Sequence, residues 1–268
     1  MQSRDALEHC HGESMKIISW NVNSLKARAE HVANFLDRVS PTVLCMQELK
    51  LEDHKIPTEI FSERGYFLET HGQRTYNGVA IASKLPMTNV VRGLPGGDEG
   101  ESRYIHAEID GVTILNLYCP QGRAVDNPKF QYKLGFYDAL QARVEKDFSP
   151  SQDLIITGDL NIAPNDDDVY DVAKMTGVCS FTDIEKQKFQ RLLDWGLSDA
   201  SKPYQEPKTF TFWDYRMNCY PRDAGYRIDH FLVSDSVLAR VQGSHVHRVE
   251  RGREKASDHA PIDLDLGI

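Results

Sequence analysis

The chain has 268 residues, and its 31 lysines and arginines against 40 aspartates and glutamates leave a formal net charge of −9. Hydrophobic residues at 40% and charged residues at 26% exclude a long disordered chain or a fibrous repeat. Five cysteines without a CxxC pair exclude a disulfide framework and a zinc site, which predicts a reducing cytosol, and no apolar run approaches the ~18 residues of a membrane helix.

The apolar pattern predicts a mixed α/β chain. We expect residues 1–14, which carry no apolar period, to form a disordered extension before a single domain at residues 15–268. Short apolar runs predict strands at residues 16–20, 42–46, 78–82, 104–109, 112–118, 153–157, 227–233 and 262–266. Amphipathic periods predict helices at residues 25–38, 56–64, 127–148 and 182–193. Because several strands follow one another directly, the order favours sheets covered by helices over a purely parallel doubly wound fold.

Polar side chains cluster at the ends of the predicted strands. They are Asn21, Glu48, Tyr118, Asp159 and Asn161 at the ends of four strands, Asp229 inside the strand at 227–233, and Asp258 and His259 before the last strand. Side chains at the carboxyl ends of apolar strands tend to meet in one crevice. The sequence therefore predicts one site built from these residues.

The residue types in this set point to phosphoryl chemistry. They offer oxygen ligands and no thiolate, a set that suits Mg²⁺ or Mn²⁺ and disfavours zinc. Mg²⁺ usually binds one or two carboxylates together with a substrate phosphate. Since the chain has neither a P-loop nor a GxGxxG motif, metal-assisted hydrolysis of a phosphate ester is the chemistry that remains. Taken singly, each residue also has an ordinary interpretation as a turn, cap or solvated side chain, so the inference rests on their ordered occurrence.

The ordered motifs resemble a known family. They are WNVNSLKAR at 20–28, MQELK at 46–50, YCPQG at 118–122, GDLNIAP at 158–164, TFWDYR at 211–216, YRID at 226–229 and SDHAP at 257–261. The chain from Met15 onward is similar to the exonuclease III and AP endonuclease family, of the endonuclease–exonuclease–phosphatase superfamily related to DNase I. The resemblance implies a four-layered α/β sandwich, with two packed mixed β-sheets flanked by helices.

The resemblance also implies roles for the clustered residues. Metal ligation would fall to Glu48 first, supported by Asn21 and Asp258, with Asp159, Asn161 and His259 nearby. Asp159 would activate the attacking water, and Asn161 would donate hydrogen bonds to the developing phosphorane. His259, held by Asp229, would contact the phosphate, and Tyr118 would bind the same phosphate or assist the leaving group. Either Asp159 or the Asp229–His259 pair would be the general base.

By the same resemblance, an aromatic segment and several basic residues would contact DNA. Phe212, Tyr226 and Ile228 would wall a pocket for a flipped-out abasic sugar. Trp213 would either join them or lie in the core, and the order Phe212-Trp213 departs from bacterial exonuclease III, whose tryptophan stands one position earlier. The polar residues of the DNA track would include Arg74, Arg103, Gln121, Arg123 and Arg216, with Lys133 and Arg227 near the same motifs. The acidic run at 165–168 predicts the N-terminus of a helix.

The resulting expectation is a Mg²⁺-dependent DNA-repair nuclease, with Mn²⁺ as an alternative cation. It would cut 5′ to abasic sites and act at the 3′ ends of duplex DNA, as a cytoplasmic, bacterial monomer away from membranes. The alternatives are a superfamily phosphatase acting on a phosphoinositide or small phosphate ester, and a DNA-binding module without catalysis. Because the net charge is −9, we expect a positive rim of loops around an acidic, metal-filled pocket.

Overall fold

The first of two β-sheets contains both ends of the described chain. The structure, a computed structural model, describes residues 14–97 and 100–267. The strands of this sheet, in spatial order, are β11 (Val241–Gly243), β12 (Ile262–Gly267), β1 (Ser14–Asn21), β2 (Val43–Gln47), β4 (Val79–Ser83) and β3 (Phe67–His71). β1 runs parallel to β2 and antiparallel to β12, so the sheet is mixed.

The second sheet repeats this plan. Its strands, in spatial order, are β5 (Thr88–Arg92), β6 (Tyr104–Ile109), β7 (Val112–Tyr118), β8 (Leu154–Asp159), β10 (Asp229–Ser234) and β9 (Leu197–Asp199). β7 and β8 are parallel, and β10 pairs antiparallel with β8. The two sheets face each other across an apolar core in which Ile17 and Ile81 of the first sheet meet Ile114 and Phe231 of the second.

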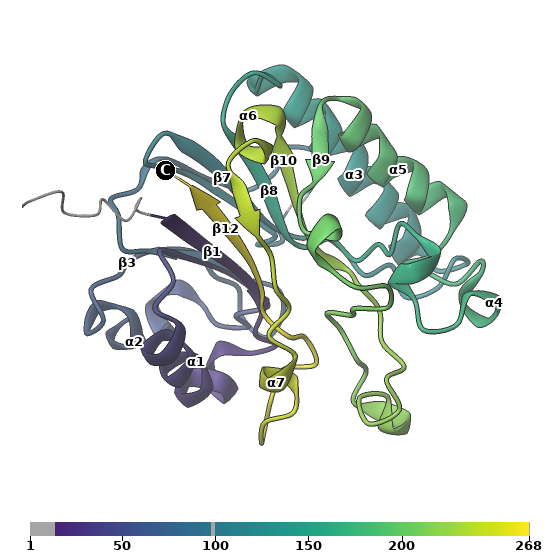
Figure 1. Cartoon of the computed structure of the whole chain (residues 1–268), viewed down its shortest axis with the longest axis horizontal. Coiled ribbons are helices and arrows are strands. Elements are labelled where there is room, and N and C mark those ends of the chain that lie inside the picture. Colours follow the sequence, from purple (N-terminus) through teal and green to yellow (C-terminus); the bar gives the residue numbers. More distant parts are fainter. Residues whose placement is uncertain (1–13, 98–99, 268) are drawn as a thin grey trace, which may run out of the picture.

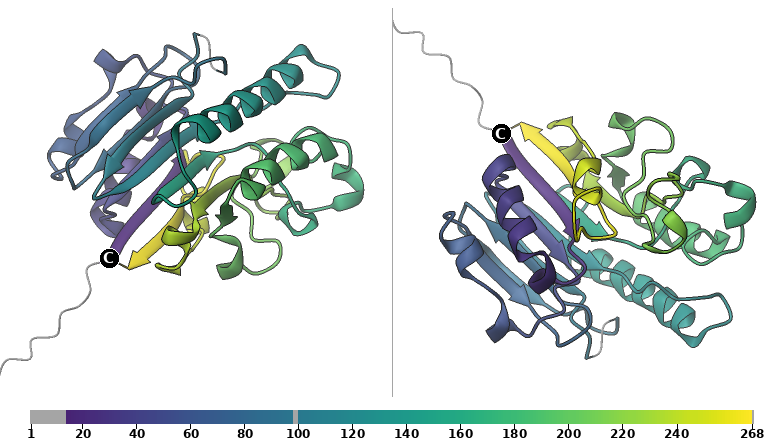
Figure 2. Two further views of the ribbon diagram at one scale, coloured as in Figure 1. Left: turned by 90° about the horizontal axis from the view of Figure 1, so that it is seen from above. Right: turned by 90° about the horizontal axis from the view of Figure 1, so that it is seen from below.

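Helices cover the two outer faces and complete four layers (Figure 2). α1 (Leu25–Val39) and α2 (Glu59–Ser62) pack on the first sheet, and α3 (Pro128–Asp147) and α5 (Asp183–Asp194) pack on the second. The shorter elements are α4 (Val172–Met175), α6 (Asp235–Leu238), α7 (Arg248–Arg251) and the 3₁₀ turns Asp53–Lys55, Asp166–Asp168, Lys202–Tyr204 and Arg216–Asn218. Within the described ranges, we find no helix with the length and apolar character that crossing a bilayer requires.

This architecture confirms the predicted sandwich, but the sequence pattern missed four strands. β3 and β5 have largely half-exposed or exposed side chains, and β9 and β11 are only three residues long, so none carries a clear apolar signal. The helix predicted at 56–64 forms only as α2 after a 3₁₀ turn. The predicted disordered extension lies outside the described residues except for Ser14, which pairs with Gly267.

The parallel pairs fix where the functional residues gather. In β1–β2 and in β7–β8 the carboxyl ends lie side by side, and β1 packs against β8 across the sandwich. The segment around Arg216–Asn218 and the loop that carries α7 project from the lower edge of Figure 1, the end toward which β1 runs. Tyr215 on the first of these segments accepts a hydrogen bond from Arg28 of α1 at 2.7 Å. This end of the molecule therefore holds the strand ends and their loops together.

Candidate active site

Asn21 joins two carboxylates that come from different sheets. Its Nδ2 donates to Oε1 of Glu48 and to Oδ2 of Asp159, at 2.9 Å in each case. Asn21 ends β1, Glu48 follows β2 directly, and Asp159 ends β8. Packing of the two sheets therefore brings together three of the residues that the sequence placed in one site.

His259 lies between two aspartates in the same buried region. Its Nδ1 is 2.8 Å from Oδ2 of Asp229, and its Nε2 is 3.6 Å from Oδ2 of Asp159. All three residues are buried, and Asp229 is the register partner of Asp159 across β10 and β8. The sheet register thus sets the spacing of the two aspartates, and the loop before β12 inserts the imidazole between them.

The surroundings raise the pKa values of both Asp159 and His259, and the two residues thereby take different roles. Burial raises the pKa of Asp159 to about 7, with Asp229 and Glu48 adding to the shift and His259 opposing it. Burial acts to lower the pKa of His259, but the carboxylates of Asp229 and Asp159 raise it to about 10. At neutral pH the imidazole of His259 therefore carries a proton on both nitrogens, held there by its two aspartates, and its role as a metal ligand stays a prediction.

Tyr118 faces the carboxylates from the end of β7. It is the register partner of Asp159, and burial followed by the charges of Glu48 and Asp159 raises its pKa well above the ordinary value. Its phenol is therefore a neutral hydrogen-bond donor. The Arg103 guanidinium stacks 4.8 Å from the ring centroid and pairs with Glu101. Arg103 is only 8% exposed, so it mainly supports Tyr118, and its contact with DNA stays a prediction.

Asn161 is fixed by the backbone around Asp159. Its N–H donates to Oδ1 of Asp159 at 3.0 Å, and its Nδ2 donates to the carbonyl of Cys119 at 2.8 Å. The residue has a φ of 53°, a left-handed conformation that asparagine tolerates better than most side chains. One amide hydrogen remains for an oxygen in the site.

Asp258 is held through a residue that the sequence analysis did not assign. Asn23 donates from Nδ2 to Oδ1 of Asp258 at 2.9 Å, and its N–H donates to Oδ1 of Asn21 at 3.0 Å. Lys50 was likewise not assigned to the site, and its Nζ lies 2.8 Å from Oε2 of Glu48. Asn23 stands in the motif WNVN and Lys50 in MQELK, so their positions inside these motifs are the signal that could have identified them.

The residues present fit a divalent cation. Ligand atoms of Asp159, Asp229 and His259 lie within 4.8 Å of one another. Oδ1 of Asp229 is buried and has no hydrogen-bond partner among the described residues. Burial opposes ionisation of Glu48, yet the charge of Lys50 and the Asn21 amide lower its pKa, so this carboxylate is already a strong cation partner. An oxygen-rich donor set of this kind suits Mg²⁺ or Mn²⁺.

An aromatic wall stands beside the imidazole, as the sequence predicted. Phe212 stacks on Tyr226 with centroids 5.8 Å apart, and its ring lies 4.9 Å from that of His259. Ile228 belongs to the same cluster, together with residues that the sequence analysis did not assign: Ala163, Val169, Tyr170, Met175 and Phe181. Of the two positions expected for Trp213, the structure shows the one in the core, because the side chain is fully buried and donates its Nε1 hydrogen to Asp223.

The basic residues divide into exposed and buried groups. Arg74 and Arg123 are exposed, and Arg123 lines a hollow of 460 Å³ with Arg103, Tyr118 and Gln121. Arg216 is exposed on the projecting segment that contains the 3₁₀ turn Arg216–Asn218, and it pairs with Asp214. A continuous positive rim stays a prediction.

Two basic residues near the motifs are not on the surface. Lys133 and Arg227 are fully buried, paired with Glu185 and Asp168 respectively, so they cannot belong to a DNA track. Asp168 ends the acidic run at 165–168, where Asn165 caps a 3₁₀ turn instead of the predicted helix. The run therefore contributes one buried ion pair as well as a cap.

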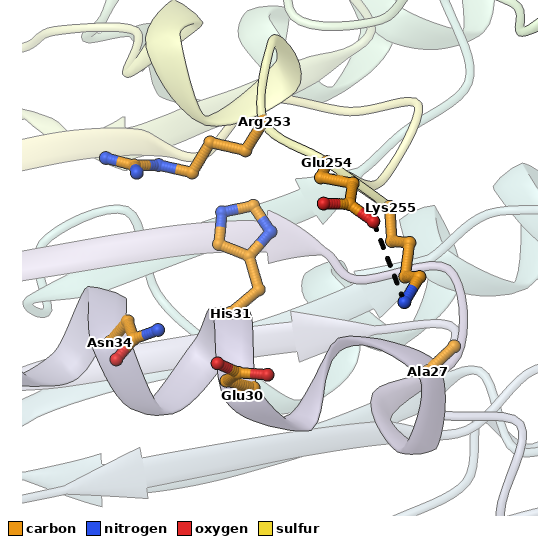
Figure 3. A pocket seen from close by; sticks show the side chains of 7 residues that line it. All are labelled: Ala27, Glu30, His31, Asn34, Arg253, Glu254 and Lys255. Atoms are coloured by element: carbon orange, nitrogen blue, oxygen red, sulfur yellow. Dashed lines mark ion pairs between the residues drawn. The ribbon is translucent and has the colours of Figure 1, made fainter.

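A separate hollow of 280 Å³ lies between α1 and the segment after α7 (Figure 3). Its lining residues are Ala27, Glu30, His31, Asn34, Arg253, Glu254 and Lys255. Charges of both signs line it, and Lys255 pairs with Glu254 across its edge. None of the predicted site residues takes part.

Comparison with known proteins agrees with this geometry. The Endonuclease/Exonuclease/phosphatase family model matches residues 18–259. Exodeoxyribonuclease III of Haemophilus influenzae is 36% identical, over 92% of this chain and 98% of that protein. A 3′ phosphatase from Neisseria, solved with a product DNA hairpin, is 40% identical, with a TM-score of 0.90 over 94% of this chain and 99% of that one. An AP endonuclease from Archaeoglobus fulgidus is 32% identical, with a TM-score of 0.90 over 95% of this chain and 100% of that one. The chain therefore belongs to the Endonuclease/Exonuclease/phosphatase family, in the branch of exodeoxyribonuclease III and the AP endonucleases.

Proposed function

We propose that this DNA repair nuclease hydrolyses phosphate esters at the 3′ ends of duplex DNA and phosphodiesters 5′ to abasic sites, with Mg²⁺ as its cation. The observation that carries the proposal is the position of Asp159, which contacts the Asn21–Glu48 pair on one side and His259 on the other. Relatives named as exodeoxyribonuclease III, 3′ phosphatase and AP endonuclease over nearly the whole chain support this substrate class.

Asp159 is the proposed acceptor of the proton of the attacking water. A pKa of about 7 makes its carboxylate basic enough to take a proton and still available near neutral pH. His259 already carries a proton under these conditions, so the difference in pKa supports Asp159 over the Asp229–His259 pair as the base. A divalent cation bound beside Glu48 would act as a Lewis acid that withdraws charge from the scissile phosphate.

Three donors would stabilise the negative charge that develops on the phosphate. The His259 imidazolium is oriented by Asp229, so its Nε2 hydrogen points into the site. The neutral phenol of Tyr118 and the free amide hydrogen of Asn161 are the other two. Donors that are held in place before the reaction need no rearrangement as the charge grows, which is the physical basis of their effect.

The aromatic wall offers a source of selectivity. The apolar cluster of Phe212, Tyr226 and Ile228 suits contact with a deoxyribose that has lost its base. Flipping a nucleotide out of the duplex costs least where no base pair has to be broken. The exposed Arg74 and Arg123 would add salt-dependent binding to the backbone. We further propose a monomer that acts in the bacterial cytosol, in keeping with relatives from Haemophilus influenzae and Neisseria.

The test uses three labelled duplexes: one with an internal tetrahydrofuran abasic site, one nicked with a 3′ phosphate, and one intact and blunt. Each is incubated with the protein in Mg²⁺, in Mn²⁺ and in excess EDTA. We expect incision 5′ to the abasic site and release of the 3′ phosphate in Mg²⁺, and no reaction in EDTA. Glu48→Ala serves as a variant with a weakened cation site, for which we expect cleavage to fall by at least 100-fold.

Turnover of inositol phosphates with no cleavage of any duplex would contradict the proposal and support a small-molecule phosphatase. Full activity in EDTA would contradict the role of the cation. Cleavage at the 3′ ends alone would support the nuclease activity and contradict the proposed abasic-site activity. A higher rate in Mn²⁺ than in Mg²⁺ at cellular concentrations would overturn the choice of Mg²⁺.

A further inference from the structure

A lysine is buried directly behind the catalytic loop. Lys133 lies in the middle of α3, and its side chain and that of its partner Glu185 on α5 are both 0% exposed. The two helices pack side by side on the outer face of the second sheet (Figure 1). An ammonium group without water requires a partner for its charge and for each of its hydrogens, so the contacts of Nζ show what holds it there.

All three hydrogens of this ammonium group have acceptors. One goes to Oε1 of Glu185, one to the carbonyl of Asn161 at 2.6 Å, and one to the carbonyl of Gln121 at 3.3 Å. Asn161 follows β8 in the catalytic loop, and Gln121 follows β7 in the motif YCPQG. A single charged group therefore binds the backbone of two loops that flank the site.

Glu185 is equally well fixed on the other side of the pair. Its Oε2 accepts from the hydroxyl of Thr182 at 2.7 Å and from the Thr182 N–H at 3.1 Å, and its Oε1 accepts from the N–H of Ser180 at 2.9 Å. The carboxylate thus closes the capping box of α5 while it holds Lys133. Neither partner of the pair can shift without breaking several other bonds.

The neighbouring glycine shows how closely the loop fits this lysine. Gly122 has a φ of 89°, and a Cβ placed on it would lie 3.1 Å from Cδ of Lys133 and 2.8 Å from Sγ of Cys179. The loop that carries Gln121 therefore lies directly against the stem of Lys133. This contact accounts for a glycine at the end of YCPQG.

We propose that the buried Lys133–Glu185 pair positions Asn161 and Gln121 for the reaction, and that its main role is in catalysis and not in stability. The inference rests on the proposed function, because Asn161 acts on the phosphate there. Replacing a buried ion pair by apolar residues of similar volume is often neutral or stabilising, so stability alone does not explain the pair. A displacement of about 1 Å at a catalytic group can cost about 100-fold in rate. Precise support of the backbone at Asn161 therefore explains why the pair is present.

The test compares three variants on the duplex that the wild-type protein cleaves best. Lys133→Met/Glu185→Gln removes both charges with side chains of similar length. Glu185→Asp keeps both charges but draws the carboxylate back by one methylene, which pulls Nζ away from the Asn161 carbonyl. Asp263→Asn is the control, because Asp263 is a buried aspartate in an ion pair with His247 outside the site. We measure thermal midpoint, kcat and KM, and the Asn161 side-chain amide signal by NMR.

We expect kcat to fall about 100-fold in the double variant and about tenfold in Glu185→Asp, with KM changed less than threefold. The Asn161 amide signal, identified by its loss in Asn161→Asp, should shift in both variants and stay in place in the control. The control should keep wild-type kcat at a similar or lower thermal midpoint. If the double variant fails to fold, Glu185→Asp and its NMR signal decide the question.

An unchanged kcat or an unmoved Asn161 signal in the folded variants overturns the positioning role. A loss of kcat that the control reproduces at an equal thermal midpoint overturns it as well, since it assigns the effect to stability. Failure of the proposed function has a different signature, because the wild-type protein then cleaves no duplex at all while the NMR comparison still tests the loop.

Discussion

Replacing Asp229 by asparagine tests the electrostatic account of the site. The substitution keeps the shape of the side chain and removes the charge that lies 2.8 Å from Nδ1 of His259. Burial lowers the pKa of this imidazole, and Asp229 is the strongest of the groups that raise it to about 10. Without that charge, the pKa should fall toward the ordinary value of 6.5 or below it.

The size of the effect follows from two contributions. At pH 8, a pKa of about 10 leaves about 99% of the imidazole protonated, whereas a pKa of 6.5 leaves about 3%, a loss of about 30-fold. The charge-assisted hydrogen bond contributes about 1.5–3 kcal/mol, or about 10- to 150-fold in rate. Together they predict that Asp229→Asn cleaves DNA about 1,000-fold more slowly at pH 8.

The assay is single-turnover cleavage of a labelled duplex by wild type and variant between pH 6 and pH 8. Because the neutral imidazole of the variant regains its proton on acidification, the ratio of the two rates should shrink about tenfold or more by pH 6. Asp263→Asn is the control, since it alters an aspartate–histidine pair outside the site. A ratio that does not change with pH, or a variant within threefold of wild type at pH 8, would refute the reasoning.

Three further predictions concern stability and selectivity. Arg227→Leu should lower the free energy of unfolding by about 3–5 kcal/mol in denaturant titrations, because it removes the buried cation that Asp168 and Asp199 share and leaves Asp168 with the half-exposed Lys202 alone; a loss under 1 kcal/mol would contradict this. Phe212→Ala should reduce incision at an abasic site at least tenfold more than release of a 3′ phosphate, and equal losses in a side-by-side assay would remove its role in the sugar pocket. Burial raises the pKa of Glu250, but His31, Arg253 and Arg38 lower it to about 2, so its contribution to stability is present above the ordinary pKa of 4.5 and is lost as pH falls toward 2. The thermal midpoint of wild type should therefore approach that of Glu250→Gln between pH 4.5 and pH 2, and a constant difference would disprove the assignment.

The sequence predicted the site better than its surroundings. Asn21, Glu48 and Asp159 stand at the ends of strongly apolar strands; parallel pairing of β1 and β2 places the first two side by side, and packing of the two sheets brings Asp159 to them. For such residues, the position at the end of a predicted strand is enough to predict a place in the site, because sheet geometry determines where a strand end lies. The same holds for Asp229, whose register partner is Asp159.

The burial of charged residues could not be predicted from their position relative to the strands. Lys133 and Arg227 stand among exposed basic residues in the sequence. Only the packing of α3 on α5, and of the segment before β10 on the 3₁₀ turn Asp166–Asp168, shows that each meets a carboxylate in the interior. Arg103 lies under Tyr118 for the same reason. Trp213 lies in the core cluster with residues of both sheets, and its Nε1 donates to Asp223. Such pairings depend on contacts between distant segments, which no local pattern encodes.

The most direct test of the central claim is the pH dependence of single-turnover DNA cleavage in Mg²⁺ by wild type and Asp159→Asn. If Asp159 is the general base, the wild-type rate falls with acidification along a limb centred at or below pH 7. The variant should then be slower by about 100- to 10,000-fold and should lack that limb. A variant that keeps the limb or the wild-type rate would contradict the account and assign the base to the Asp229–His259 pair.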